Sequence, residues 1–164
     1  MSINTAAQPL VLDPPQIVET PTVQTAVIRF TIPREEIRSV MGPGIQELMA
    51  TVTAQGIKPA GRIFSHHFKM DPATFDFEIG VPVSTPVTAS GRVKPGQLEA
   101  RKVVRTVYHG GYENLGAAWD EFEQWIAANG HNTAPDLWET YLTGPDANPD
   151  PATYTTELNH PLAD

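Results

Sequence analysis

Cysteine is absent from the 164 residues, which excludes disulfides, thiol nucleophiles and cysteine metal sites together. Basic clusters are also missing, because the 11 Lys and Arg residues are scattered and the net charge is −8. A nucleic-acid surface normally shows a basic stripe, so we expect no direct DNA or RNA binding. No apolar stretch is long enough to span a membrane, and the N-terminus has no signal-peptide pattern. We therefore expect a cytoplasmic protein that does not enter a membrane.

The sequence also lacks three common signatures of catalysis or cofactor binding. Its five histidines show no metal-ligand spacing, and the adjacent His66 and His67 would point to opposite faces of a strand. No glycine-rich phosphate loop and no nucleophile elbow occurs. We therefore expect no metal and no cofactor.

What the chain does contain is a duplication. Residues 71–83 read DPATFDFEIGVPV and residues 150–162 read DPATYTTELNHPL. Upstream of each copy, a helical pattern ends in a glycine, Gly56 and then Gly130, where a left-handed C-terminal cap belongs. The sequence therefore predicts two similar units, each with a helix followed by two strands, and the natural place for a ligand is the seam between them.

The length and composition fit one domain with its own core. Residues 1–15 are polar and end in two prolines, which predicts a loose N-terminal arm ahead of a single domain over 16–164. The first repeat covers about 16–83 and the second 97–164. The segment 84–96 is rich in turn-forming residues and predicts a linker between them.

Apolar alternation and turn residues predict the individual elements. We expect strands at about 24–31, 61–68, 74–83, 98–108, 136–143 and 153–160. The first helix is predicted to start at Gly42-Pro43, with proline at the first helical position, and to end at Gly56. The second helix is predicted over about 112–129.

The strand LWETYL, residues 137–142, carries the most informative polar pair. Because side chains alternate along a strand, Glu139 and Tyr141 share one face. If that face lines a cavity, Glu139 supplies a negative charge and Tyr141 a hydroxyl group and a ring, which suits cationic aromatic ligands. The pair could instead direct a water molecule at an electrophile. The alternative is an edge strand with Glu139 in solvent.

Comparison of the two repeats adds further candidates. Ser65 and His67 fall at the positions of Glu139 and Tyr141, as expected for a pocket on a pseudo-twofold axis. The second helix presents Trp119 where the first has only Ile45. Aromatic residues build pockets as well as cores, so Trp119 is a pocket candidate or a core residue. The turn before that helix adds two more candidates, Tyr108 and Tyr112.

Taken together, these residues resemble the GyrI-like small-molecule-binding domain family, which includes the effector-binding domains of AraC-type and BmrR-type regulators. The matching stretches are FDFEIGVPV (75–83), VYHGGYENLGAAWDEFEQWI (107–126), LWETYLTGP (137–145) and YTTELNHPL (154–162). The resemblance implies an α+β fold, in which two pseudo-twofold-related strand–helix–strand–strand repeats form an antiparallel sheet with two helices.

The resemblance also implies a function for particular residues. In the family an acidic residue at the centre of the groove contacts ligands, and its position corresponds to Glu139. Aromatic neighbours line the cavity, which supports Tyr141 and Trp119. The ligand-binding candidates are then these two and Glu139, together with His67, Tyr108, Tyr112 and Phe77. Because only about fifteen residues precede the first strand, we expect a stand-alone version without the DNA-binding domain of the regulators.

Three functions remain open on this basis. The first is a binding protein for aromatic or cationic amphipathic small molecules, used for sensing or sequestration. The second is a hydrolase of electrophilic, cyclopropanoid-type compounds, in which Glu139 and Tyr141 activate water. The third is a partner-binding protein that resembles the gyrase inhibitor and acts through its acidic surface.

Overall fold

The computed structural model describes residues 10–145 and 148–163. In this part of the chain, nine strands form one antiparallel sheet in the order β1-β7-β9-β8-β4-β5-β3-β6, with β2 also paired to β7. The strands are β1 (Val11–Leu12), β2 (Gln16–Thr20), β3 (Val23–Pro33), β4 (Phe64–Met70), β5 (Thr74–Pro82), β6 (Lys94–Leu98), β7 (Arg101–His109), β8 (Leu137–Thr143) and β9 (Thr155–Pro161). The helices are α1 (Ile37–Ala54) and α2 (Leu115–Ala128). The α+β class with two helices on an antiparallel sheet is thus confirmed.

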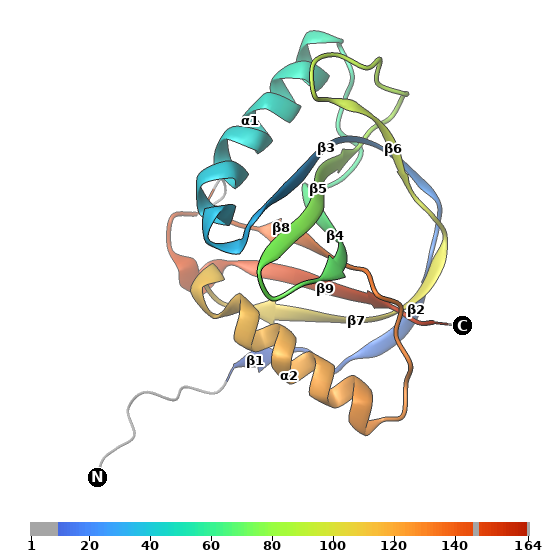
Figure 1. The fold of residues 1–164 in the computed structure, drawn as a ribbon, viewed down its shortest axis with the longest axis vertical. Coiled ribbons are helices and arrows are strands. Elements are labelled where there is room, and N and C mark those ends of the chain that lie inside the picture. The colour runs from blue at the N-terminus through green and yellow to red at the C-terminus, as the bar shows by residue number, and fades with distance from the viewer. Residues whose placement is uncertain (1–9, 146–147, 164) are drawn as a thin grey trace.

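Each helix covers its own half of the curled sheet, as Figure 1 shows. On α1, Leu48 and Val52 are completely buried against side chains of β3 and β5. On α2, Phe122 and Ile126 pack in one cluster with Val104 of β7 and Leu158 of β9. The apolar stripes of both helices therefore make two separate cores, and the central strands β4 and β8 lie between them.

The pairing of residues between strands has the same register in both repeats. Ser65 on β4 pairs directly with Glu139 on β8, and these are equivalent positions 74 residues apart, so the pseudo-twofold axis passes through this pair. Both repeats interrupt their strand pairing at the same place, after His67 in the first and after Tyr141 in the second. Both helices are followed by a glycine with positive φ, Gly56 at 70° and Gly130 at 76°, which confirms the predicted caps.

The first strand of each repeat pairs with the other repeat. β2 runs along β7, whereas β6 runs along β3. The strand predicted over 98–108 corresponds to β7, which begins at Arg101, whereas Leu98 is the last residue of β6. The predicted linker 84–96 already contains the start of β6, which pairs with β3 of the first repeat. The arm predicted over 1–15 contributes β1, paired with β7, while residues 1–9 lie outside the described residues.

The predicted start of the first helix was wrong. A short 3₁₀ turn at Arg34–Glu36 leads directly into α1, so Pro43 lies inside the helix instead of at its start. Packing outweighs the local preference, because Val40 and Met41 pack against the core from the turn before Pro43. Gly44 then allows a close approach, since a Cβ atom there would lie 2.9 Å from the Ile79 side chain. α2 likewise starts at Leu115, after a 3₁₀ turn that begins at Tyr112.

Candidate functional site

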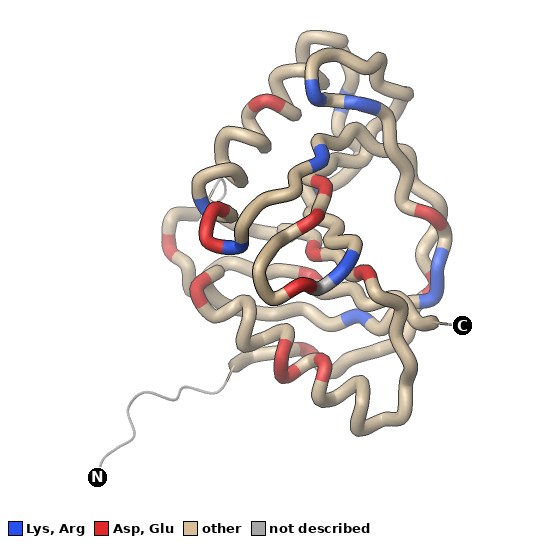
Figure 2. The backbone as a smooth tube through the Cα atoms, in the orientation of Figure 1, with Lys and Arg blue, Asp and Glu red and all other residues tan. Residues whose placement is uncertain are grey.

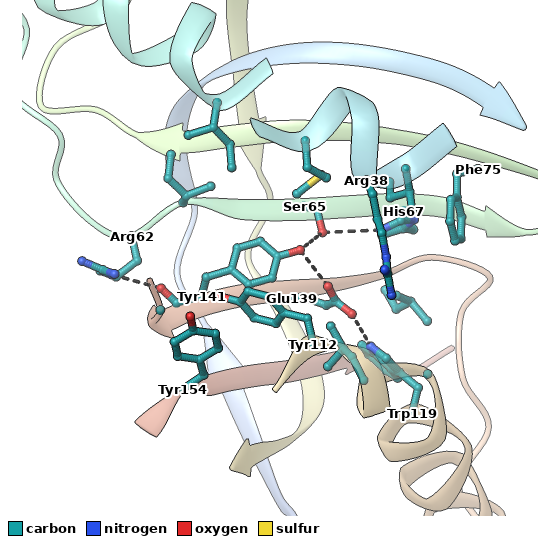
Figure 3. Close-up of a pocket in the computed structure, with 18 of the residues that line it drawn as sticks. Arg38, Arg62, Ser65, His67, Phe75, Tyr112, Trp119, Glu139, Tyr141 and Tyr154 are labelled. Atoms are coloured by element: carbon teal, nitrogen blue, oxygen red, sulfur yellow. Dashed lines mark hydrogen bonds between the residues drawn. The ribbon is translucent and has the colours of Figure 1, made fainter. Parts of the chain in front are cut away.

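A groove of about 1820 Å³ lies between the two helices, and its floor is formed by β4 and β8. It is partly open to solvent, and both repeats contribute to its walls. Figure 3 labels ten of the lining residues: Arg38, Arg62, Ser65, His67, Phe75, Tyr112, Trp119, Glu139, Tyr141 and Tyr154. Five residues predicted from the sequence therefore meet in one groove, namely His67, Tyr112, Trp119, Glu139 and Tyr141.

Glu139 lies at the centre of the groove floor with only 7% of its surface exposed. The indole of Trp119 donates to one carboxylate oxygen at 2.6 Å, and the hydroxyl of Tyr141 donates to the other at 2.8 Å. Burial raises the pKa of Glu139, although these hydrogen bonds and one from Ser65 favour the ionised form. The site thus holds a desolvated carboxylate in a fixed orientation.

A chain of polar contacts extends from Glu139 into the first repeat. The hydroxyl groups of Tyr141 and Ser65 are 2.8 Å apart, and Ser65 Oγ is 3.4 Å from Nε2 of His67. Burial lowers the pKa of His67 to about 4, and the electrostatic influence of His66 and Arg34 adds to the shift, so the His67 imidazole is neutral at physiological pH. Burial and the Glu139 charge raise the pKa of Tyr141 well above its usual value, so the phenol stays protonated. Glu139 is therefore the acidic group of this chain of contacts, and the hydrogen bonds from Trp119 and Tyr141 stabilise its ionised form.

Three tyrosine rings form one end of the groove. The ring of Tyr112 is 5.9 Å from that of Tyr141, edge to face, and 5.1 Å from that of Tyr154. The opposite end presents Phe75, whose ring lies 5.2 Å from His67. Phe75 and Tyr154 were not predicted as site residues from the sequence. They are the equivalent aromatics that follow the two DPAT segments, and this repeat could have identified them as a pair on the two walls.

Two aromatic residues predicted for the walls lie elsewhere. Phe77 is completely buried in the core below α1, stacked on Phe30 at 5.5 Å. Tyr108 is 2% exposed in the core below α2, and its hydroxyl donates to the carbonyl of Gly111. Neither residue lines the groove. Their positions in the chain beside the pocket elements suggested a wall, but the helices above them cover both rings.

Among residues 10–145 and 148–163, no group of three or more His, Asp or Glu side chains is arranged to hold a metal ion. Within the same ranges, neither helix is sufficiently long and apolar to cross a membrane.

The structure thus defines the class of the protein. It is an internally duplicated α+β domain with a wide groove between its two helices. The chain belongs to the GyrI-like small molecule binding domain family, whose model matches residues 13–163. A comparison with curated proteins found no match.

Several solved structures share the fold. The C-terminal domain of EcmrR superposes with a TM-score of 0.80 and 21% identity, over 92% of this chain and 98% of that domain. In the EcmrR–DNA complex the same region matches with a TM-score of 0.79 and 22% identity over 91% of this chain, which spans only 57% of the EcmrR chain. SAV2435, solved with bound tetraphenylphosphonium, has a TM-score of 0.65 and 13% identity over 92% of this chain and 94% of its own. A hydrolase encoded by lin2189 from Listeria innocua has a TM-score of 0.64 and 14% identity, with 91% of each chain covered. At these identities the likeness establishes the fold alone.

Proposed function

We propose that this protein binds aromatic or cationic amphipathic small molecules in the groove, for sensing or sequestration. The observation that carries the proposal is the buried carboxylate of Glu139 on the floor of a groove lined by aromatic rings. A cation that reaches this carboxylate gains an attraction several times larger than it would in water, because the local dielectric is low. The tyrosine rings at one end add aromatic faces on which a cation can lie.

The size of the groove supports ligands larger than a metabolite fragment. A groove of about 1820 Å³ exceeds the roughly 300–1000 Å³ of typical small-molecule pockets. Its apolar side chains include Met41, Met49 and Ile45 from α1, which can adapt to different ligand shapes. A large, partly open groove with a single buried charge favours bulky aromatic cations over small polar compounds.

A pair of ions with nearly the same shape tests this proposal. Tetraphenylphosphonium and tetraphenylborate each carry four phenyl rings around a central atom but have opposite charges. By calorimetry in about 150 mM salt, which screens the negative surface, the phosphonium should bind at least about tenfold more tightly than the borate, a difference of about 1.4 kcal/mol. Equal affinity, or tighter binding of the borate, would show that the charge of Glu139 does not select the ligand.

A second candidate is hydrolysis of a strained electrophilic ring. It is favoured by the direct contact between Glu139 and Tyr141 on the groove floor, together with the raised pKa of Glu139, which makes it a stronger base than an exposed glutamate. In such a reaction the carboxylate would accept a proton from water while the water oxygen bonds to a ring carbon. The strained C–C bond of the ring would break, its electron pair would pass to the carbonyl group conjugated with the ring, and the resulting anion would take up a proton.

Incubation with a cyclopropanoid alkylating agent distinguishes the two candidates. A hydrolase should produce many equivalents of the water adduct by mass spectrometry, and Tyr141→Phe should lower the rate while the protein stays folded. Recovery of one intact ligand per protein, without a water adduct, would instead identify a binding protein.

A further inference from the structure

The charges that line the groove are separated between the two repeats. Among the described lining residues, the cations come from the first repeat, namely Arg34, Arg38, Arg62 and Lys69, and the carboxylates come from the second, namely Glu113, Asp120, Glu123 and Glu139. Figure 2 shows acidic residues along α2, and both basic and acidic residues at the start of α1. The same turn at the start of α1 also carries Glu35 and Glu36, which are exposed and do not line the groove. The groove therefore has opposite charges on its two walls.

The closest contacts of Arg34 are with a backbone carbonyl and an aromatic ring. Arg34 donates from Nε to the backbone carbonyl of Asp71 at 2.6 Å, and its guanidinium lies 4.4 Å from the centre of the Phe75 ring. The Asp71 carboxylate is near, but it accepts hydrogen bonds from the backbone of Ala73 and Thr74. Neither Arg34 nor Arg38 forms a salt bridge with any carboxylate of the described residues.

The two arginines belong to the same end of the groove. Arg34 lies over Phe75, and Figure 3 shows Arg38 extending from α1 into the groove on the side of His67 and Phe75. His67 lines this end, is neutral, and has a buried Nδ1 atom without a hydrogen-bond partner. Across the groove, an oxygen of the Glu123 carboxylate lies 2.5 Å from Nδ1 of His160. This end consequently offers two guanidinium groups that form no salt bridge within the described residues.

We propose that the end formed by Arg34, Arg38 and His67 is a subsite for a carboxylate of the ligand. The preferred ligands are then bipolar aromatic molecules, with the cationic part beside Glu139 and an anionic group at the two arginines. The inference rests on the proposed function, because it assigns the second half of the same groove. Guanidinium groups suit a carboxylate since they can donate two parallel hydrogen bonds to it.

Two dyes with the same chromophore test the subsite. Rhodamine 110 is a zwitterion with a free carboxylate, whereas rhodamine 123 is its methyl ester and carries only the positive charge. We expect the native protein to bind rhodamine 110 about fivefold more tightly in fluorescence anisotropy titrations, as is reasonable for a partly exposed charge pair. Arg38→Gln should remove this preference and change the affinity for the ester by less than about twofold, and Arg38→Glu should reverse the preference.

Arg62→Gln is the matched control, because Arg62 lines the other end of the groove. It should leave the preference for the free acid intact, and loss of the preference in this variant alone would overturn the placement at Arg34 and Arg38. Equal binding of both dyes to the native protein would overturn the subsite while the proposed cation binding stands. Failure of both dyes to bind would overturn the proposed function and the subsite with it. Circular dichroism spectra of each variant verify that the fold is kept.

Discussion

Replacement of Glu139 by glutamine is expected to weaken the binding of tetraphenylphosphonium by about 30-fold. The amide has nearly the same shape, so it can keep the hydrogen bond from Trp119 at the position of Oε2 and still contact Tyr141. Only the negative charge is lost. Removal of one partner of a desolvated charge pair costs roughly 2 kcal/mol or more, which corresponds to this factor. Calorimetric titration of the native protein and the variant under identical conditions measures it.

The stability of the same variant provides the control. Glu139→Gln should weaken ligand binding but increase the free energy of unfolding. Burial raises the pKa of Glu139 above the ordinary value of 4.5. The native state therefore holds this proton more tightly than the unfolded chain, and the stability that Glu139 contributes is lost as the pH rises from about 4.5 through the raised pKa. Glu139→Gln has no such loss, so its free energy of unfolding should increase relative to the native protein over this pH range. Urea titrations at several pH values measure this difference, and a variant that lost stability as well as affinity would instead indicate a structural role.

Replacement of Phe77 by alanine is expected to have the largest effect on stability. The Phe77 ring has no exposed surface, stacks on Phe30 at 5.5 Å and lies 5.0 Å from the ring of His67. Its removal leaves a cavity in the core below α1 that the surrounding strands cannot fill, which costs about 3–5 kcal/mol. Urea or thermal denaturation should report a loss of this size, a large fraction of the stability of a domain of this length.

Phe75, two residues before Phe77 on β5, provides a matched comparison. Its ring is partly exposed and lines the groove, so Phe75→Ala should cost only about 1–2 kcal/mol of stability. The same substitution should weaken the binding of an aromatic cation, because the ring is a wall of the groove. If the two substitutions were equally destabilising, the assignment of Phe77 to the core and Phe75 to the groove would be incorrect.

The sequence predicted the duplication because both copies keep the residues that end each helix and begin each final strand. Gly56 and Gly130 need a positive φ, and only glycine adopts this conformation at little cost. The pairing of Glu139 with Tyr141 also followed from the sequence, because side chains two residues apart on a strand share a face. The actual hydrogen bond between them, at 2.8 Å, agrees with that expectation.

Other features depend on contacts between residues far apart in the sequence. The position of Pro43 inside α1 results from packing against β3 and β5, which a local rule for proline does not include. The pairing of β2 with β7 and of β6 with β3 likewise joins each repeat to the first strand of the other. Burial of Tyr108 and Phe77 likewise depends on where the helices lie above them.

The sequence by itself thus determined the two repeats, the glycine caps and the shared face of the polar pair, because each depends on local backbone geometry. The tertiary structure decided which aromatic rings line the groove and which fill the core. It also decided that Trp119 of α2 reaches the carboxylate of Glu139 on β8, at 2.6 Å. The physical reason is that exposure, desolvation and charge separation arise only when the two repeats are packed about their common axis, with Ser65 directly opposite Glu139.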